Sequence, residues 1–150
     1  MKPATLALAI GLLTWWIPAF AGDIDIRQPW ARASAGAGKT AAAYVTIVNG
    51  GAADALIGAA TPVAARATLH GHRMDGDMMR MRPIDRVALA PGATVILAPG
   101  GIHIMMFGLT RRLVEGETFP LPLTFENAGA LQVTATVAGV GAKGPPHAGH

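Results

Sequence analysis

The sequence predicts an all-β protein folded as a two-sheet sandwich or a barrel. Short segments rich in Val, Ile, Thr and Leu alternate with Gly, Pro and Asn, and no stretch has the period of an amphipathic helix. Many short strands at such spacing are typical of sandwiches and barrels. The 150 residues, 51% hydrophobic and 14% charged, suit one compact domain.

Turn-forming residues divide the chain into ten expected strands. Residues 49–51, 91–92, 99–101 and 127–129 combine Gly with Asn or Pro and are typical of turns. The expected strands are Ile24–Ala33, Ala42–Val48, Leu56–Ala60, Ala65–His70, Met78–Pro83, Val87–Leu89, Thr94–Ala98, Ile102–Leu109, Phe119–Glu126 and Leu131–Val137. In the last of these, apolar and polar residues alternate, which predicts one buried face.

The two ends of the chain differ from its middle. Lys2, the apolar run Ala4–Ala21 and the closing Ala19-Phe20-Ala21 predict a signal peptide over residues 1–21. An uncleaved membrane anchor is the alternative. The folded domain should then span 22–140, with no membrane segment after cleavage, and 141–150 should be a flexible tail because it lacks periodicity.

Composition excludes several classes of function. The chain has no cysteine, so disulfides, thiolate nucleophiles, iron–sulfur clusters, the thiolate of blue copper and a lipidated cysteine are all ruled out. The net charge of +3 falls to +2 without Lys2, and the arginines of 73–86 alternate with aspartates. This mixed surface predicts no nucleic-acid partner, and its aspartates, Asp75, Asp77 and Asp85, are interpreted as solvated.

One set of side chains predicts that the protein binds a metal ion. His70, Met81, His103 and Met105 follow the spacing H-x10-M-x21-H-x-M. Two thioethers and two imidazoles are neutral, soft to borderline ligands, and they favour Cu(I) over harder divalent ions. These four residues are therefore the predicted metal ligands.

Strand parity places the predicted ligands. Residues 103 and 105 should share one face, about 6.6–7 Å apart. Ile102, Ile104 and Met106 would then form the core face, which turns His103 and Met105 toward solvent or an edge.

The same parity separates Met79 and Met81 from Met78, Arg80 and Arg82. Met78, Met79 and Met106 are interpreted as core filler. His72 and Met74 are candidates to supplement or compete with the four ligands. The tail histidines, His147 and His150, offer at most a weak Cu(II) site.

At these residues the chain resembles the PCuAC-type periplasmic copper chaperones, and the likeness extends through 41–49, 99–103 and 122–126 to cover about residues 28–138. The resemblance implies a cupredoxin-like two-sheet β-sandwich in the periplasm. It also implies that His70, Met81, His103 and Met105 bind Cu(I), which passes to the copper centre of cytochrome c oxidase without enzymatic activity. Gly71, where the family often has Glu or Met, and the short tail depart from the pattern.

Two other classes of function stay open. An exported copper-dependent oxidoreductase needs His-dominated ligation with an open position, which the few Tyr and His residues disfavour. A β-sandwich assembly module without metal would leave the clustered His and Met residues unexplained. Copper titration under reducing conditions separates the three classes.

Overall fold

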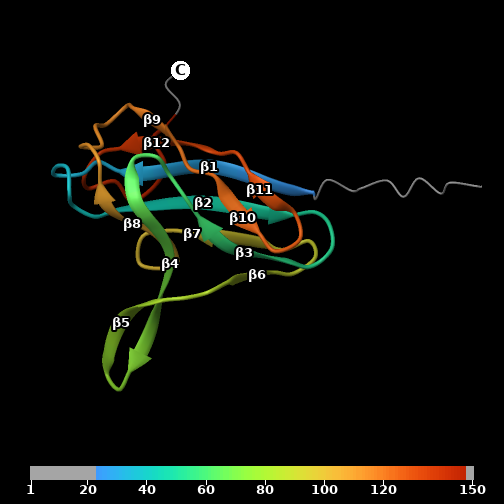
Figure 1. Ribbon diagram of the computed structural model, residues 1–150. Coiled ribbons are helices and arrows are strands. Elements are labelled where there is room, and N and C mark those ends of the chain that lie inside the picture. The colour runs from blue at the N-terminus through green and yellow to red at the C-terminus, as the bar shows by residue number, and fades with distance from the viewer. Residues whose placement is uncertain (1–22, 148–150) are drawn as a thin grey trace, which may run out of the picture.

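A computed structural model describes residues 23–147, and in this part of the chain every regular element is a strand (Figure 1). The predicted signal peptide, 1–21, and His150 lie outside the described residues. The strands are β1 (Ile24–Arg32), β2 (Ala41–Asn49), β3 (Asp54–Ala59), β4 (Ala64–Asp75), β5 (Met78–Pro83), β6 (Val87–Leu89), β7 (Thr94–Leu97), β8 (His103–Leu109), β9 (Thr118–Pro120), β10 (Leu123–Phe125), β11 (Gly129–Leu131) and β12 (Thr134–Ala138).

The strands form two sheets, which confirms the predicted sandwich. The larger sheet has the order β5-β4-β8-β2-β1-β12-β9, and β7 pairs with the end of β2 that β8 leaves free. The smaller sheet has the order β11-β10-β3-β6. Neighbouring strands are antiparallel except for β1 and β12, which are parallel.

The core lies between the sheets and is built from alternate residues of their strands. Ile47, Ile104 and Met106 from the larger sheet and Leu56 from the smaller one are fully buried in a single cluster. The predicted core face of β8 and the core interpretation of Met106 are therefore confirmed. The opposite residues of β8 lie on the outer face of the larger sheet, the face turned away from the smaller sheet.

Two expected strands are each divided between the sheets. The segment 119–126 gives β9 in the larger sheet and β10 in the smaller one, and 131–137 is split between β11 and β12 in the same way. Pro122 has no N–H to donate to a ladder, and the chain turns there from one sheet to the other. Leu121, just before Pro122, and Val133, between β11 and β12, are both buried. The backbone N–H of Leu121 donates a hydrogen bond of 2.7 Å to the carbonyl of Val133.

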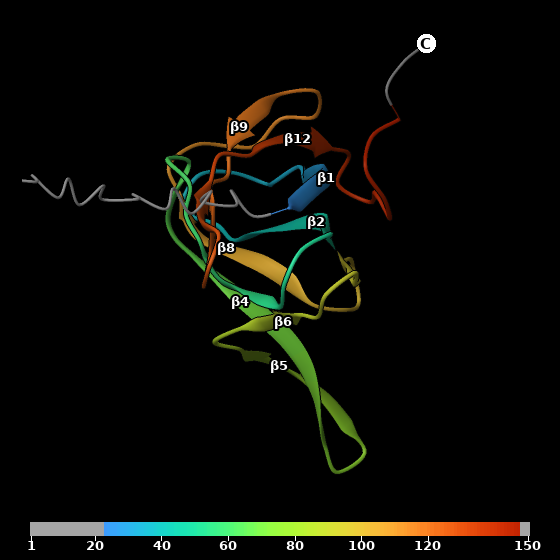
Figure 2. The same cartoon turned by 90° about the vertical axis from the view of Figure 1, so that its right-hand side faces the viewer.

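Strands β4 and β5 form a hairpin that extends beyond the sandwich as a two-stranded arm (Figures 1 and 2). Its two-residue loop begins with Gly76 at φ +63°, as a tight type II′ turn requires. Met78 and Met79 are 62% and 63% exposed, so their interpretation as core filler is wrong. Past Gly71 the hairpin has no second sheet beside it, and both of its faces meet solvent.

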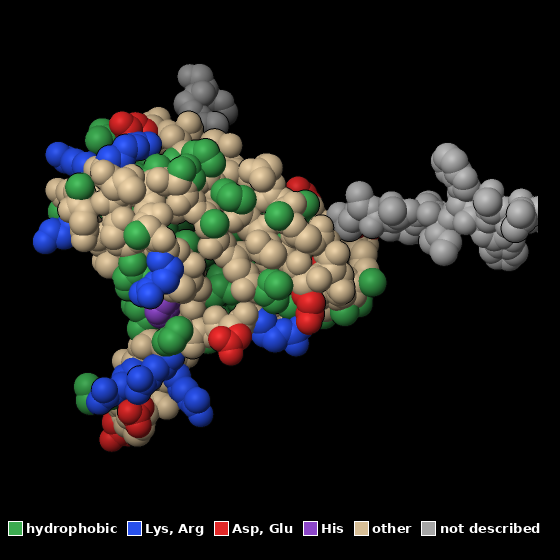
Figure 3. Space-filling view, viewed as in Figure 1, with side chains coloured by type: hydrophobic (Ala, Val, Ile, Leu, Met, Phe, Trp, Pro, Cys, Tyr) green, Lys and Arg blue, Asp and Glu red, His purple; other side chains and the backbone are tan. Residues whose placement is uncertain are grey.

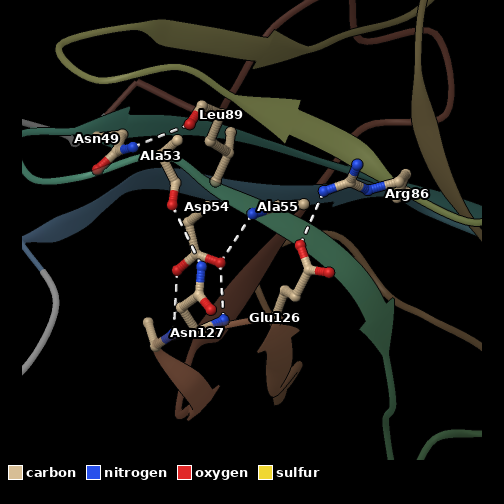
Figure 4. Close-up of polar contacts among 9 residues, drawn as sticks. Asn49, Ala53, Asp54, Ala55, Arg86, Leu89, Glu126 and Asn127 are labelled. Carbon is tan, nitrogen blue, oxygen red and sulfur yellow. Dashed lines mark hydrogen bonds and ion pairs between the residues drawn. The ribbon is translucent and has the colours of Figure 1, made fainter.

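A polar network joins the start of β3 to the turn between β10 and β11. The carboxylate of Asp54 accepts hydrogen bonds from the backbone N–H groups of Ala55, Asn127 and Ala128 (Figure 4). Burial alone would raise the pKa of Asp54, but these three donors hold it below its usual value. A hollow of about 460 Å³ lies beside them. Asn49 lines it at the end of β2 remote from β8, so the hollow lies away from the predicted ligands.

The chain after β12 returns to the outer face of the larger sheet. Ala142 packs against the buried pair Trp30 and Tyr44, and its carbonyl accepts a hydrogen bond of 2.8 Å from Nε of Arg32. The flexibility of 141–150 stays a prediction. Within 23–147 no helix has the length and apolar character needed to cross a membrane.

Candidate metal centre

His70 and His103 face each other across β4 and β8. They are directly opposed in the antiparallel register, with ring centroids 5.9 Å apart and planes inclined by 19°. Their exposed fractions are 9% and 4%. The local sequence gave no sign of where His70 points, because this pairing depends on the long-range register of two strands.

The ring of His103 is held in one orientation. Its Nδ1 donates a hydrogen bond of 3.0 Å to the carbonyl of Gly101, in the turn that Gly100 makes possible at φ +84°. Its Nε2 is buried and has no hydrogen-bond partner among the described residues. With the proton on Nδ1, Nε2 presents a free lone pair, which is the arrangement of a metal-ligating histidine.

His103 is more enclosed than expected. The sequence predicted that it turns toward solvent or an edge. His103 does lie on the outer face, but the rings of His70, His72 and Tyr44 surround it with centroids 5.9–6.4 Å away. Burial lowers the pKa of His103, the Gly101 carbonyl partly offsets this, and the charges of the neighbouring histidines lower it further. The imidazole is therefore neutral at pH 7, the form that binds a metal ion.

Supporting contacts also orient His70. Its Nδ1 lies 3.3 Å from Oγ1 of Thr68, and its ring packs against Phe107 at 5.8 Å. The guanidinium of Arg66 covers that phenyl ring at 4.8 Å from its centroid. These contacts leave Nε2 of His70 free for a ligand.

The two predicted methionines lie on the same face as the histidines but at different depths. Met105 is part-buried, opposite Thr68 on β4, and lines a small hollow with Tyr44 and Arg32. Met81 is 46% exposed on the edge strand β5. Strands are about 4.8 Å apart, so its backbone lies about 10 Å across the sheet from β8. The structure thus assembles His70, His103 and Met105, with Met81 at their margin.

His72 belongs to this cluster and was not among the four predicted ligands. Its ring centroid is 6.0 Å from that of His103, and its direct cross-strand partner is Met81. It is exposed, so it covers the cluster from outside. The signal in the sequence was its position two residues after His70, which puts both on one face of a strand.

The surroundings of the cluster are basic. Histidine surface is visible where the hairpin joins the sandwich, with Lys or Arg side chains above and below it (Figure 3). Parity puts Arg80 and Arg82 on the hairpin face opposite Met81, and Arg80 pairs with Asp75 at 3.2 Å. Within 23–147 no three His, Asp or Glu side chains are grouped to hold a metal ion by themselves.

The fold and this cluster of side chains together define the class of protein to which the chain belongs. The chain is a cupredoxin-like β-sandwich of the PCuAC type, with paired histidines and thioethers on one outer face. It belongs to the LpqE-like family, described as "Putative lipoprotein LpqE-like", whose model matches residues 24–137. It is 31% identical over 119 residues to "Putative lipoprotein Lxx21020" of Leifsonia xyli subsp. xyli, covering 78% of this chain and 70% of that protein.

Solved structures of similar proteins agree with this class. The copper-bound PCuAC domain from PmoF2 is 28% identical, with a TM-score of 0.68 over 79% of this chain and 94% of that domain. Apo-DR1885 from Deinococcus radiodurans is 29% identical, with a TM-score of 0.62 over 93% and 91%. The Cu(I) form, CuI-DR1885, is 34% identical, with a TM-score of 0.53 over 73% and 76%.

The family description and the name of the Leifsonia protein both contain the word lipoprotein.

Proposed function

We propose that this protein is an exported copper chaperone of the periplasm. It binds one Cu(I) ion through His70, Met81, His103 and Met105 and passes it to a cuproprotein, with the copper site of cytochrome c oxidase as the recipient that the resemblance suggests. The observation that carries the proposal is the buried Nε2 of His103, which has no hydrogen-bond partner within 23–147 and belongs to the ring that faces His70. An unpaired buried acceptor costs about 1–3 kcal/mol, and a bound metal ion would remove that cost.

The donor set selects the metal. Both histidines hold Nδ1 in a hydrogen bond and keep Nε2 free, and the thioether of Met105 lies on the same face. Imidazole and thioether carry no charge, and the thioether is soft, so the set suits a soft monovalent ion better than Zn(II), which usually takes thiolate, imidazole or carboxylate, or Ca(II), which takes oxygen ligands. The copper-bound and Cu(I) structures of similar proteins support the same metal.

The unequal exposure of the ligands suits transfer. His70 and His103 are buried and fixed, whereas Met81 stands half-exposed on an edge strand. A recipient's ligand can replace the thioether of Met81 first, while the histidines still hold the ion. Transfer is then ligand exchange, with copper remaining Cu(I) throughout.

The alternative of a copper oxidoreductase finds less support. Its metal would need an open position for substrate, whereas here rings close around His103. Tyr44, the single tyrosine, is buried against Trp30, with ring centroids 4.5 Å apart and ring planes tilted by 37°. A chaperone function explains the enclosed His103 and the buried Tyr44, because metal transfer needs neither an open substrate position nor an acid–base catalyst.

The proposal is tested by competition for Cu(I) with a colorimetric chelator under reducing conditions. The Met81→Leu, Met105→Leu double variant keeps side-chain volume and removes both sulfurs, so affinity should fall by at least a hundredfold. Met78→Leu is the control, because Met78 is also exposed, at 62% against 46% for Met81, but lies on the other face of the hairpin. A double variant that binds Cu(I) as tightly as the parent would show that the ligand set is wrong.

A further inference from the structure

The β4–β5 hairpin carries a ladder of soft ligands outward from the candidate centre. His72 faces Met81 across the two strands, and one step further out Met74 faces Met79. Alternate residues share a face, so both pairs lie on the same face as His70. Directly opposed side chains have Cβ atoms about 4.5–5.5 Å apart, which allows two thioethers to bind one ion.

The exposure of these methionines has no explanation in packing. Met74 and Met79 are 58% and 63% exposed, on an arm that has no sheet beside it (Figure 2). Large apolar side chains exposed together mark an interaction site more often than a structural one. Here both side chains are methionine, and the property that distinguishes Met from Leu at an exposed site is its sulfur.

We propose that Met74 and Met79, with His72 as third ligand, form a second and weaker site for a soft monovalent cation, Cu(I) or Ag(I). His72 lies two residues before Met74, on the same strand face by parity, and is diagonal to Met79, within reach of long side chains. Three flexible, exposed ligands must be ordered when the ion binds, so this site is weaker than one with buried histidines.

Charge on the hairpin supports this placement. Arg73, Arg80 and Arg82 fall on the opposite face by the same register, so their guanidinium groups do not crowd the thioethers. Arg80 is further paired with Asp75. The soft face is therefore free of positive side chains even though the arm is basic.

The position of the second site allows it to load Cu(I) into the candidate metal centre. This role rests on the proposed function, because His72 lies 6.0 Å from His103 between ring centroids and so adjoins both sites. An ion held by Met74, Met79 and His72 can move inward by exchanging one thioether at a time for Met81 and the buried histidines, while His72 still holds it. The ion stays Cu(I), so the movement needs no oxidant or reductant.

The test is a titration of the protein with Ag(I), a diamagnetic probe for Cu(I), followed by NMR of 13C-labelled methionine methyl groups. The parent should bind two ions, and the second should shift the signals of Met74 and Met79 but not that of the buried Met106. The Met74→Leu, Met79→Leu variant should bind one ion. Met78→Leu, on the other face of the arm, should still bind two.

The outcomes separate this site from the proposed chaperone site. In the His103→Leu, Met105→Leu variant, the tight ion should be lost while Met74 and Met79 still respond to Ag(I). If the parent binds a single ion, or if the Met74→Leu, Met79→Leu variant retains both, the hairpin site does not exist and the chaperone site is untouched. If instead the His103→Leu, Met105→Leu variant keeps its tight ion, the proposed chaperone site is wrong. The comparison of the parent with the Met74→Leu, Met79→Leu variant still tests the hairpin site in that case.

Discussion

Replacing His103 with leucine should separate a functional histidine from a structural one. The side chain is 4% exposed, and its Nε2 has no partner among the described residues. Removing an unsatisfied buried acceptor should recover about 1–3 kcal/mol, whereas losing the hydrogen bond to the Gly101 carbonyl should cost about 0.5–1.5 kcal/mol. Leucine is close in volume to histidine, so the stability of the metal-free variant should lie between about 0.5 kcal/mol below and about 2.5 kcal/mol above that of the parent.

The assay is urea unfolding followed by circular dichroism, with and without Cu(I). At a free Cu(I) concentration 100-fold above Kd the parent should gain about 2.7 kcal/mol, and His103→Leu should gain almost none of it. Met106→Ala, which empties a fully buried core position, is the control and should cost about 2–5 kcal/mol. A metal-free His103→Leu protein destabilised by more than about 2 kcal/mol would refute this reasoning, because the histidine would then be structural.

Three further predictions concern pH, the polar network and metal removal. Because burial lowers the pKa of His103, protons compete with Cu(I) for this imidazole only below the usual imidazole range. The affinity for Cu(I) should therefore decrease once the pH is below about 6. An affinity that stays constant from pH 7 to pH 5 would contradict histidine ligation. The lowered pKa of Asp54 means that its contribution to stability is complete above the ordinary carboxyl pKa and is lost as pH falls through the lowered value. Asp54→Asn should therefore cost about 1–3 kcal/mol at pH 7 and less in acid, as urea unfolding at several pH values will show. The metal-free protein should unfold cooperatively, because its core contains no metal ligand; an unfolded circular dichroism spectrum without copper would oppose this.

Local patterns predicted the features of the fold that depend on neighbouring residues. The limits of Met78–Pro83 and Val87–Leu89 agree with β5 and β6, and the alternation around Ile104 and Met106 identified the core face of β8. Parity along β5 also placed Met81 and Arg80 on opposite faces, in agreement with the register.

The remaining features depend on contacts between distant segments. The opposition of His70 and His103 follows from the register of β4 with β8, which no local period contains. Met78 and Met79 look like core residues until the hairpin is known to leave the sandwich. His72 was predicted only to supplement or compete with the four ligands, because the spacing pattern did not include it, although its strand parity with His70 was available. The divided strands reflect the crossing at Pro122, which interrupts pairing without interrupting the apolar alternation.

Copper K-edge X-ray absorption of the protein loaded with one equivalent of Cu(I) reports the ligand atoms of the proposed site. We expect a first shell that contains both imidazole nitrogen, from His70 and His103, and thioether sulfur, from Met81 and Met105. The sulfur contribution should disappear in the Met81→Leu, Met105→Leu variant and remain unchanged in Met78→Leu. A shell of nitrogen and oxygen alone in the parent, or a sulfur shell that persists in the double variant, would contradict the proposed copper site.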